Sequence, residues 1–174
     1  MRHLFILRHA QAAQSQSGED KHRPLTKQGL ADALALGQTM KAKGYIPDFV
    51  IGSPARRAQQ TAKKVLEATG PCQTVSPATA YYTTIAQLYE LIKMVDAKYQ
   101  GVLLVSHNPS VHGLAKFLAG LGPDDAMYRL RSDYKECTLT VLECPIDSWS
   151  TLMPSQNDLS DLLIQGRDFT GHIS

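Results

Sequence analysis

The chain has 174 residues, of which 43% are hydrophobic and 20% charged, and this composition fits one globular domain over residues 1–174. Eighteen basic and sixteen acidic side chains leave a net charge of +2, so we expect neither nucleic acid nor a membrane as a partner. The three cysteines form no C-x-x-C pair, and no apolar run approaches the roughly 18 residues of a membrane span. These features exclude secreted, fibrous, disordered and membrane classes, and they predict a monomeric cytoplasmic domain.

Strands and helices are expected to alternate along the chain. In chain order we predict a strand at 4–7, a loop at 11–23, a helix at 27–43, a strand at 48–51, a helix at 54–69, a strand at 72–75, a helix at 85–98, a strand at 101–105, a helix from Asn108-Pro109 to Gly120 and a strand at 139–142. Thr26 predicts an N-cap, Gly44 a helix end, and Ser53-Pro54 an N-cap followed by Pro at the first helical position. Residues 149–174 give no clear pattern, and we expect them to pack against the sheet.

This alternation predicts an α/β fold, a three-layer α/β/α sandwich with a mainly parallel sheet. In such sheets, ligands bind beyond the carboxyl ends of the strands. Arg8-His9 follows the first predicted strand, residues 52–57 follow the second, and His107-Asn108 follows the strand at 101–105. If these strands are neighbours, arginines and histidines meet at one edge of the sheet.

Such a cluster of arginine and histidine side chains predicts a site that binds a phosphoryl group. Two of the strand ends lead into helix N-termini, which favour anions, and arginine supplies a rigid fork of donors for phosphate oxygens. A neutral histidine beside the phosphoryl group can attack phosphorus, while a second, protonated histidine stabilises the charge that develops on the oxygens. This chemistry needs no metal or other cofactor, and the magnesium-linked motif G-x-x-x-x-G-K-[ST] does not occur.

Each motif has a simpler interpretation when it is taken alone. Arg8-His9 can be a solvated loop, His107 a turn residue bonded to the backbone, and Ser53-Pro54 only a helix start. Arg56 and Arg57 occupy a first helical turn, where positive charge is mildly unfavourable unless an anion compensates it. The equivalent positions of the candidates at strand ends favour the functional interpretation.

In these motifs the sequence resembles the histidine phosphatase superfamily, which has the phosphoglycerate mutase-like fold. The strand followed by Arg8-His9-Ala10 resembles its opening Arg-His-Gly signature. Three further blocks follow in the family's order, namely Arg23-Pro24-Leu25-Thr26-x-x-Gly29, Ser53-Pro54-x-x-Arg57-Ala58-x-Gln60-Thr61-Ala62 and Ser106-His107-Asn108-Pro109. The short chain and the last block are most similar to the SixA-type phosphohistidine phosphatases.

The resemblance implies a role for each matching residue. His9 would be the phosphorylated nucleophile, Arg8 and Arg57 the phosphate clamps, and His107 the second histidine of the pocket. The backbone N–H of Asn108 would be a further phosphate donor. Within the second block, Arg23 is expected to be an internal ion-pair or hydrogen-bond partner and Thr26 an N-cap. Arg56, His3, His22, His112 and His172 are expected to be bystanders, surface residues or core residues.

Two departures from the family pattern matter. Ala10 stands in place of the usual glycine and puts a Cβ beside the nucleophile. The larger mutase and phosphomonoesterase branches carry an acidic proton donor after the third strand, but residues 78–84 hold no carboxylate. Glu19 and Asp20 in the first long loop are the candidate substitutes.

The missing acid constrains the substrate, because an ester oxygen leaves poorly without a proton whereas imidazole is a good leaving group. Between Pro71 and Gly101 no insertion covers the pocket, which we therefore expect to be shallow and open. We expect a phosphohistidine phosphatase that acts on a phosphorylated protein such as a histidine-containing phosphotransfer domain. Two alternatives stay open: a broad phosphomonoesterase that uses Glu19, Asp20 or its substrate for proton delivery, and a non-catalytic module that binds phosphate or phosphohistidine.

Overall fold

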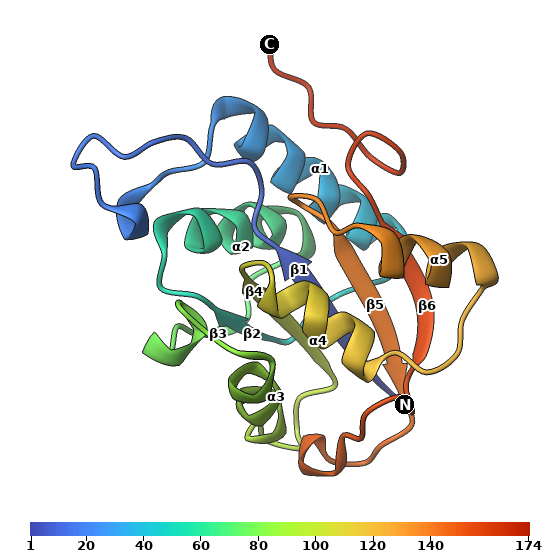
Figure 1. Cartoon of the computed structure of the whole chain (residues 1–174). Helices are drawn as coiled ribbons and strands as arrows, with labels where there is room; N and C mark the ends of the chain where they lie inside the picture. The colour runs from blue at the N-terminus through green and yellow to red at the C-terminus, as the bar shows by residue number, and fades with distance from the viewer.

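Six strands form the central sheet of the computed structural model, which describes residues 1–174. The strands are β1 (Arg2–Arg8), β2 (Phe49–Gly52), β3 (Gln73–Val75), β4 (Gly101–Ser106), β5 (Leu139–Cys144) and β6 (Asp158–Leu163). Their order across the sheet is β3-β2-β4-β1-β5-β6 (Figure 1). Strands β3, β2, β4 and β1 pair in parallel, whereas β5 pairs antiparallel with both β1 and β6. The expected mainly parallel sheet is confirmed for its first four strands and is mixed beyond them.

Helices cover both faces of this sheet. They are α1 (Lys27–Ala42), α2 (Arg56–Thr69), α3 (Ile85–Lys93), α4 (Ser110–Leu118) and α5 (Asp124–Ser132), and three short 3-10 turns are η1 (Asp20–His22), η2 (Ala78–Ala80) and η3 (Trp149–Thr151). The core next to α1 and α2 is separate from the core next to α3, α4 and α5. Figure 1 shows α1 and α2 together on one side of the sheet. The three-layer sandwich expected from the sequence is therefore confirmed.

The apolar run of β1 explains why two cores form. Successive side chains of a strand point to opposite faces of the sheet. Leu4 and Ile6 accordingly belong to the core under α3, α4 and α5, while Phe5 and Leu7 belong to the core under α1 and α2. A strand that is buried on both faces needs apolar residues at every position, which is the pattern typical of a parallel sheet.

The start of α1 fixes the loop that follows β1. Thr26 Oγ1 accepts a hydrogen bond from the N–H of Gly29 at 2.9 Å, as its predicted N-cap role requires. A Cβ at Gly29 would lie 2.2 Å from the carbonyl oxygen of Gln11. The third residue of the helix must therefore be glycine if the chain just beyond His9 is to approach α1 this closely.

Two predicted helix boundaries are wrong. Helix α2 begins at Arg56 with Ala55 as its N-cap, two residues after the predicted start, because the Ser53 hydroxyl serves a turn and accepts from the N–H of Ala55 at 3.2 Å. Helix α3 ends at Lys93 instead of residue 98. Beyond it, the Asp96 carboxylate accepts from the N–H of Lys98 at 2.9 Å, and this local turn competes with continued helix.

Two elements were not predicted. Helix α5 follows Pro123 and has two acidic residues in its first turn and two basic residues in its last turn, so its signals were present in the sequence. Strand β6 lies in the C-terminal segment and pairs with β5. The expected packing of this segment against the sheet thus occurs through an added edge strand.

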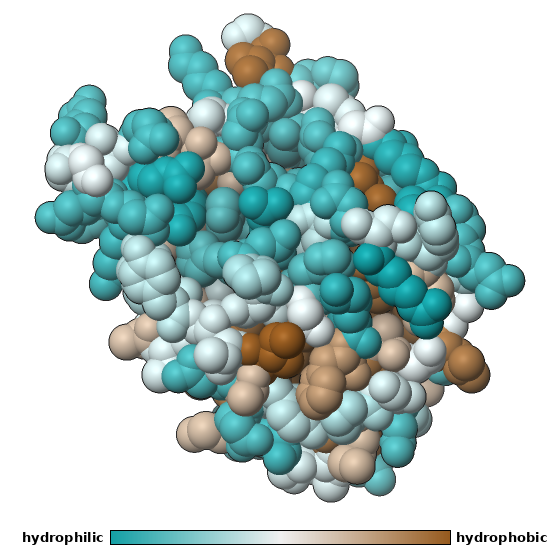
Figure 2. Space-filling view, in the orientation of Figure 1, coloured by the Kyte–Doolittle hydropathy of each residue, from teal (hydrophilic) through white to brown (hydrophobic).

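No helix has both the length and the apolar composition needed to cross a bilayer. Figure 2 shows a face that is mostly hydrophilic, on which apolar side chains form small separate spots.

Candidate active site

Three neighbouring parallel strands bring the candidate residues to one edge of the sheet. Arg8 is in register with Ser106, and Gly52 with Val105, so the residues that follow β1, β2 and β4 emerge together. The His9 N–H bonds the Ser106 carbonyl at 3.1 Å. The spacing of the sheet therefore places His9, Ser53 and His107 side by side.

His9 is buried, with 8% of its surface exposed, and its two ring nitrogens have different partners. Nδ1 lies 2.7 Å from the carbonyl oxygen of Ala10, and because a carbonyl only accepts, Nδ1 carries the proton. Nε2 therefore keeps its lone pair. Burial, followed by the charges of Arg57 and Arg8, lowers the pKa of His9 from 6.5 to about 4, although the Ala10 carbonyl acts in the opposite direction. The ring is neutral at physiological pH, as a nucleophile must be.

Arg57 extends from the first turn of α2 toward the free nitrogen of His9. Its Nε lies 3.4 Å from His9 Nε2. Its two terminal nitrogens donate to Asp20, one to the main-chain oxygen at 2.8 Å and one to Oδ2 at 3.0 Å. The guanidinium is thus held rigidly, with one edge facing the candidate nucleophile.

His107 is the second ring of the cluster, and its centroid lies 5.2 Å from that of His9. Its Nε2 is 2.7 Å from the hydroxyl of Ser53. Burial, the His9 ring and Arg57 lower the pKa of His107 to about 3, so the ring is neutral, in contrast to the protonated ring expected from the sequence. A phosphoryl dianion beside it would act the other way, because a nearby anion raises the pKa of an imidazole.

Arg8 and Asn108 meet at one main-chain oxygen. The carbonyl of Tyr134 accepts from an Arg8 terminal nitrogen at 3.0 Å and from Asn108 Nδ2 at 2.9 Å. The other terminal nitrogen of Arg8 lies 4.0 Å from a Glu136 carboxylate oxygen. The charge of Arg8 contributes to the lowered pKa of both histidines, so all four principal candidates lie at the same edge of the sheet.

Of the two candidate proton donors, only Asp20 reaches the site. Its Oδ2 accepts from the Tyr81 hydroxyl at 2.6 Å as well as from Arg57. The Tyr81 hydrogen bond is the main cause that lowers the pKa of Asp20 to about 2, so Asp20 holds no proton at neutral pH. Glu19 faces solvent, 3.3 Å from His22. This geometry argues against a donor role for either residue.

Two residues of the site were not recognised as functional from the sequence. Ser53, expected only as a helix cap, is fully buried and hydrogen-bonded to His107. Its position directly after a central strand was the available signal. Tyr81 lies in the stretch that was noted only for its missing carboxylate, and its contact with Asp20 spans 61 residues of sequence. No local pattern reports a contact of that separation.

The residues expected to be structural make no hydrogen bond with His9, Arg57 or His107, although Arg23 contacts Asp20. Arg23 Nε donates to the Ala13 carbonyl at 3.0 Å, and an Arg23 terminal nitrogen donates to Asp20 Oδ1 at 3.3 Å. Arg56 is exposed. His112 Nε2 lies 2.6 Å from the Leu130 carbonyl, and its ring stacks on that of Tyr134. His3, His22 and His172 lie at the surface or partly exposed.

A pocket of about 240 Å³ opens beside His107 and Arg57. The segment between Pro71 and Gly101 supplies one wall through Tyr81, Tyr82 and Thr83. Tyr82 is 80% exposed at this wall. Tyr81 and Tyr82 thus form an aromatic rim on one side of this pocket.

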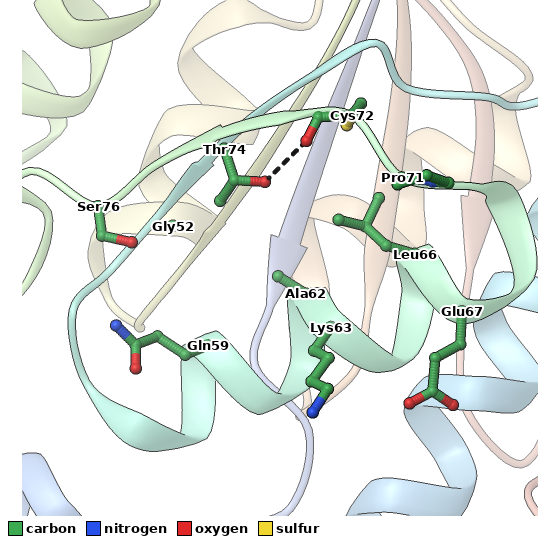
Figure 3. A pocket seen from close by; sticks show the side chains of 10 residues that line it. All are labelled: Gly52, Gln59, Ala62, Lys63, Leu66, Glu67, Pro71, Cys72, Thr74 and Ser76. Carbon is green, nitrogen blue, oxygen red and sulfur yellow. Dashed lines mark hydrogen bonds between the residues drawn. The ribbon is translucent and has the colours of Figure 1, made fainter.

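A larger pocket, of about 480 Å³, lies between α2 and the edge strand β3 (Figure 3). Gln59, Lys63 and Glu67 of α2 line one wall, and Cys72 and Thr74 line the other. It contains no histidine or arginine, so it lacks the groups that would bind and attack a phosphoryl group. The smaller pocket instead contains Arg57 and His107.

Comparison with known proteins agrees with this geometry. The sequence matches the family model of the histidine phosphatase superfamily (branch 1) over residues 4–80. An uncharacterized protein of Mycobacterium tuberculosis is 31% identical over 121 residues, which cover 69% of this chain and 74% of that protein. An uncharacterized chloroplastic protein of Arabidopsis thaliana is 28% identical over 159 residues, which cover 85% of this chain and 69% of that protein.

Among solved structures, a protein from Agrobacterium tumefaciens proposed to be the phosphohistidine phosphatase SixA superimposes with a TM-score of 0.78. The two chains are 27% identical, and the match covers 94% of this chain and 97% of that one. The likeness extends over both halves of the sheet, beyond the residues that the family model matches. The chain belongs to the histidine phosphatase superfamily.

Proposed function

We propose that this histidine phosphatase removes the phosphoryl group from a phosphohistidine side chain of another protein. The observation that carries the proposal is a neutral His9, whose unprotonated Nε2 accepts a hydrogen bond from Arg57 Nε, in a site where the carboxylate of Asp20 is ionised. Such a pocket has a nucleophile and anion-binding groups but no carboxylic acid to protonate a leaving alkoxide. Substrates whose leaving group departs without that proton are favoured.

In the first step, the lone pair on His9 Nε2 forms a bond to phosphorus while the bond from phosphorus to the substrate nitrogen breaks. When the distal nitrogen of the substrate ring carries a proton taken from solvent, the ring leaves as neutral imidazole. The Nδ1–H of His9 donates to the Ala10 carbonyl, and this hydrogen bond stabilises the positive charge that the phosphorylated ring acquires. No metal or cofactor takes part in this step.

In the second step, water attacks the phosphorus of the phosphorylated His9. The P–N bond breaks and its electron pair returns to Nε2, while the oxygen and both protons of the water stay with inorganic phosphate as H2PO4⁻. Because Nδ1 already carries a proton, His9 leaves as a neutral imidazole, and the enzyme returns to its starting state. The same tautomer thus serves both steps.

The remaining residues bind the transferred group. Arg57 presents Nε toward the position of the phosphoryl group, and Arg8 adds a second guanidinium. His107 and the backbone N–H of Asn108 complete the set of donors that we assign to the oxygens. Preorganised donors of this kind act most strongly on the charge that develops in the transition state.

The lack of a covering subdomain supports a protein substrate, and we propose a histidine-containing phosphotransfer domain. The segment between Pro71 and Gly101 forms only β3, η2 and α3, so no subdomain encloses the site. The exposed Tyr82 at the rim offers an aromatic surface to an approaching partner. The likeness to a protein proposed to be SixA agrees with this substrate class.

The proposal is tested by comparing kcat/KM for a phosphorylated histidine-containing phosphotransfer domain, an aryl phosphate and a sugar phosphate. We expect the sugar phosphate to be slower by about 10²- to 10⁴-fold, which is the usual worth of general acid catalysis. His9→Gln should abolish turnover, and exposed His172→Gln is the matched control. Acid-labile phosphate trapped on His9 of the wild type would distinguish an enzyme from a binding module. A sugar phosphate cleaved as fast as the phosphoprotein would contradict the substrate assignment.

A further inference from the structure

Asp20 accepts two hydrogen bonds from Arg57. Its main-chain oxygen accepts from one terminal nitrogen at 2.8 Å, and its Oδ2 accepts from the other at 3.0 Å. Both contacts are at the outer end of the guanidinium, so the Nε edge faces His9 Nε2 at 3.4 Å. A guanidinium has five N–H donors, and the two that remain on the terminal nitrogens are available to a ligand.

Asp20 is itself held from two directions. The Tyr81 hydroxyl donates to Oδ2 at 2.6 Å, and Arg23 donates to Oδ1 at 3.3 Å. Arg23 is fixed in turn by the Ala13 carbonyl. The carboxylate is thus anchored to η1, to the loop after β1 and to the segment after η2, and its position does not depend on Arg57 alone.

We propose that Asp20 and Tyr81 are positioning residues that hold the guanidinium of Arg57 in the orientation required for binding the phosphoryl group. This inference rests on the proposed function only in taking Arg57 as a phosphate ligand. Tyr81 acts through Asp20, and Asp20 acts through Arg57, so neither residue needs to touch the substrate. A guanidinium that is fixed before the ligand arrives loses less conformational entropy on binding than a free one.

Two other roles for Asp20 make opposite predictions. A proton donor would matter more for poor leaving groups than for good ones. A carboxylate that competes with phosphate for Arg57 would weaken phosphate binding, so its removal would tighten that binding. The positioning role predicts weaker phosphate binding and an equal loss of rate for every leaving group.

The test uses Asp20→Asn, Tyr81→Phe and the double variant of the full chain. Calorimetry measures binding of inorganic phosphate, and kcat/KM is measured for a series of aryl phosphates whose leaving groups differ in pKa. We expect phosphate binding and kcat/KM to fall about 10- to 100-fold in Asp20→Asn, by the same factor across the series, as for a misplaced catalytic group. Tyr81→Phe should lose less, and the double variant should resemble Asp20→Asn, because residues of one network are not additive.

Glu19→Gln is the matched control, since it removes the same charge from the neighbouring position without contacting Arg57, and it should bind phosphate like the wild type. Tighter phosphate binding by Asp20→Asn, or a loss that grows with the pKa of the leaving group, would overturn the proposal. If Asp20→Asn does not fold, as judged by circular dichroism, Tyr81→Phe alone decides between these outcomes. Phosphate binding needs no turnover, so the result stands even if the chain cleaves no phosphohistidine.

Discussion

At the scale of single residues, the two nitrogens of His9 have different partners, and this difference suits both steps of the proposed reaction. The Ala10 carbonyl fixes the proton on Nδ1, and the lone pair on Nε2 is thereby directed toward Arg57. Burial keeps the whole ring neutral, since a charged ring would lose its hydration there. A histidine in these surroundings has an unprotonated nitrogen at neutral pH without a neighbouring base.

This arrangement predicts the titration of His9. Nitrogen-15 NMR should show a protonated Nδ1 and an unprotonated Nε2 at pH 7, and the ring should gain its second proton with a midpoint of about 4. The spectrum of His9→Gln assigns the signal. A midpoint near the ordinary value of about 6.5 would mean that the ring is solvated and that its charged state is accessible at neutral pH.

At the scale of elements, the sequence predicted the strands that carry the site and missed the contacts between them. The ends of β1, β2 and β4 were evident because parallel strands are short apolar runs followed by polar residues. The same reasoning could not find Tyr81, whose role depends on a contact with Asp20 across the fold. It also assigned Ser53 to helix capping, because a serine before proline has that role more often than it bonds a buried histidine.

The pairing of α1 with α2 depends on a small residue at the crossing. A Cβ on Gly37 would lie 2.7 Å from the carbonyl oxygen of Val65 and 3.1 Å from the Cβ of Ala68. The two helices cover one face of the sheet, and α2 begins at the turn that holds Arg57. The spacing of this layer thus bears on the position of an arginine of the site.

Gly37→Ala should destabilise the fold. Overpacking at such a contact costs about 1–3 kcal/mol, and the better helix propensity of alanine returns up to about 1 kcal/mol. We therefore expect a lower free energy of unfolding in urea, by about 1–2 kcal/mol. Gln38→Ala, at the exposed neighbouring position of α1, is the control and should not destabilise the protein. Equal stability of Gly37→Ala and wild type would show that the helices separate without cost.

At the scale of the whole molecule, the two buried histidines link the site to the stability of the fold. The pKa of His9 is lowered to about 4 and that of His107 to about 3, whereas both rings in the unfolded chain titrate near the ordinary value of about 6.5. Below that pH the unfolded state binds more protons than the folded state. Stability is therefore lost as the pH falls from about 6.5 toward 4 for His9 and toward 3 for His107.

Unfolding measured at pH 7 and pH 5 tests this linkage. For His9 alone, the free energy of unfolding should fall by about 2 kcal/mol between these values, since one unit of pKa corresponds to about 1.36 kcal/mol. His9→Gln removes one of the two groups and should reduce the dependence on pH. The pKa of Asp20, near 2, lies below this window, so its titration does not contribute. A free energy of unfolding that does not change from pH 7 to pH 5 would contradict the lowered pKa values.

Several polar side chains of the site are held by main-chain oxygens: His9 by that of Ala10, Arg57 by that of Asp20, and both Arg8 and Asn108 by that of Tyr134. A substitution changes a side chain but leaves the carbonyl in place. The residues that supply these main-chain oxygens can therefore be substituted without loss of the acceptor, provided that the backbone keeps its path. Position 10 is an example: the family signature has glycine there, and the alanine of this chain presents the same main-chain oxygen to His9.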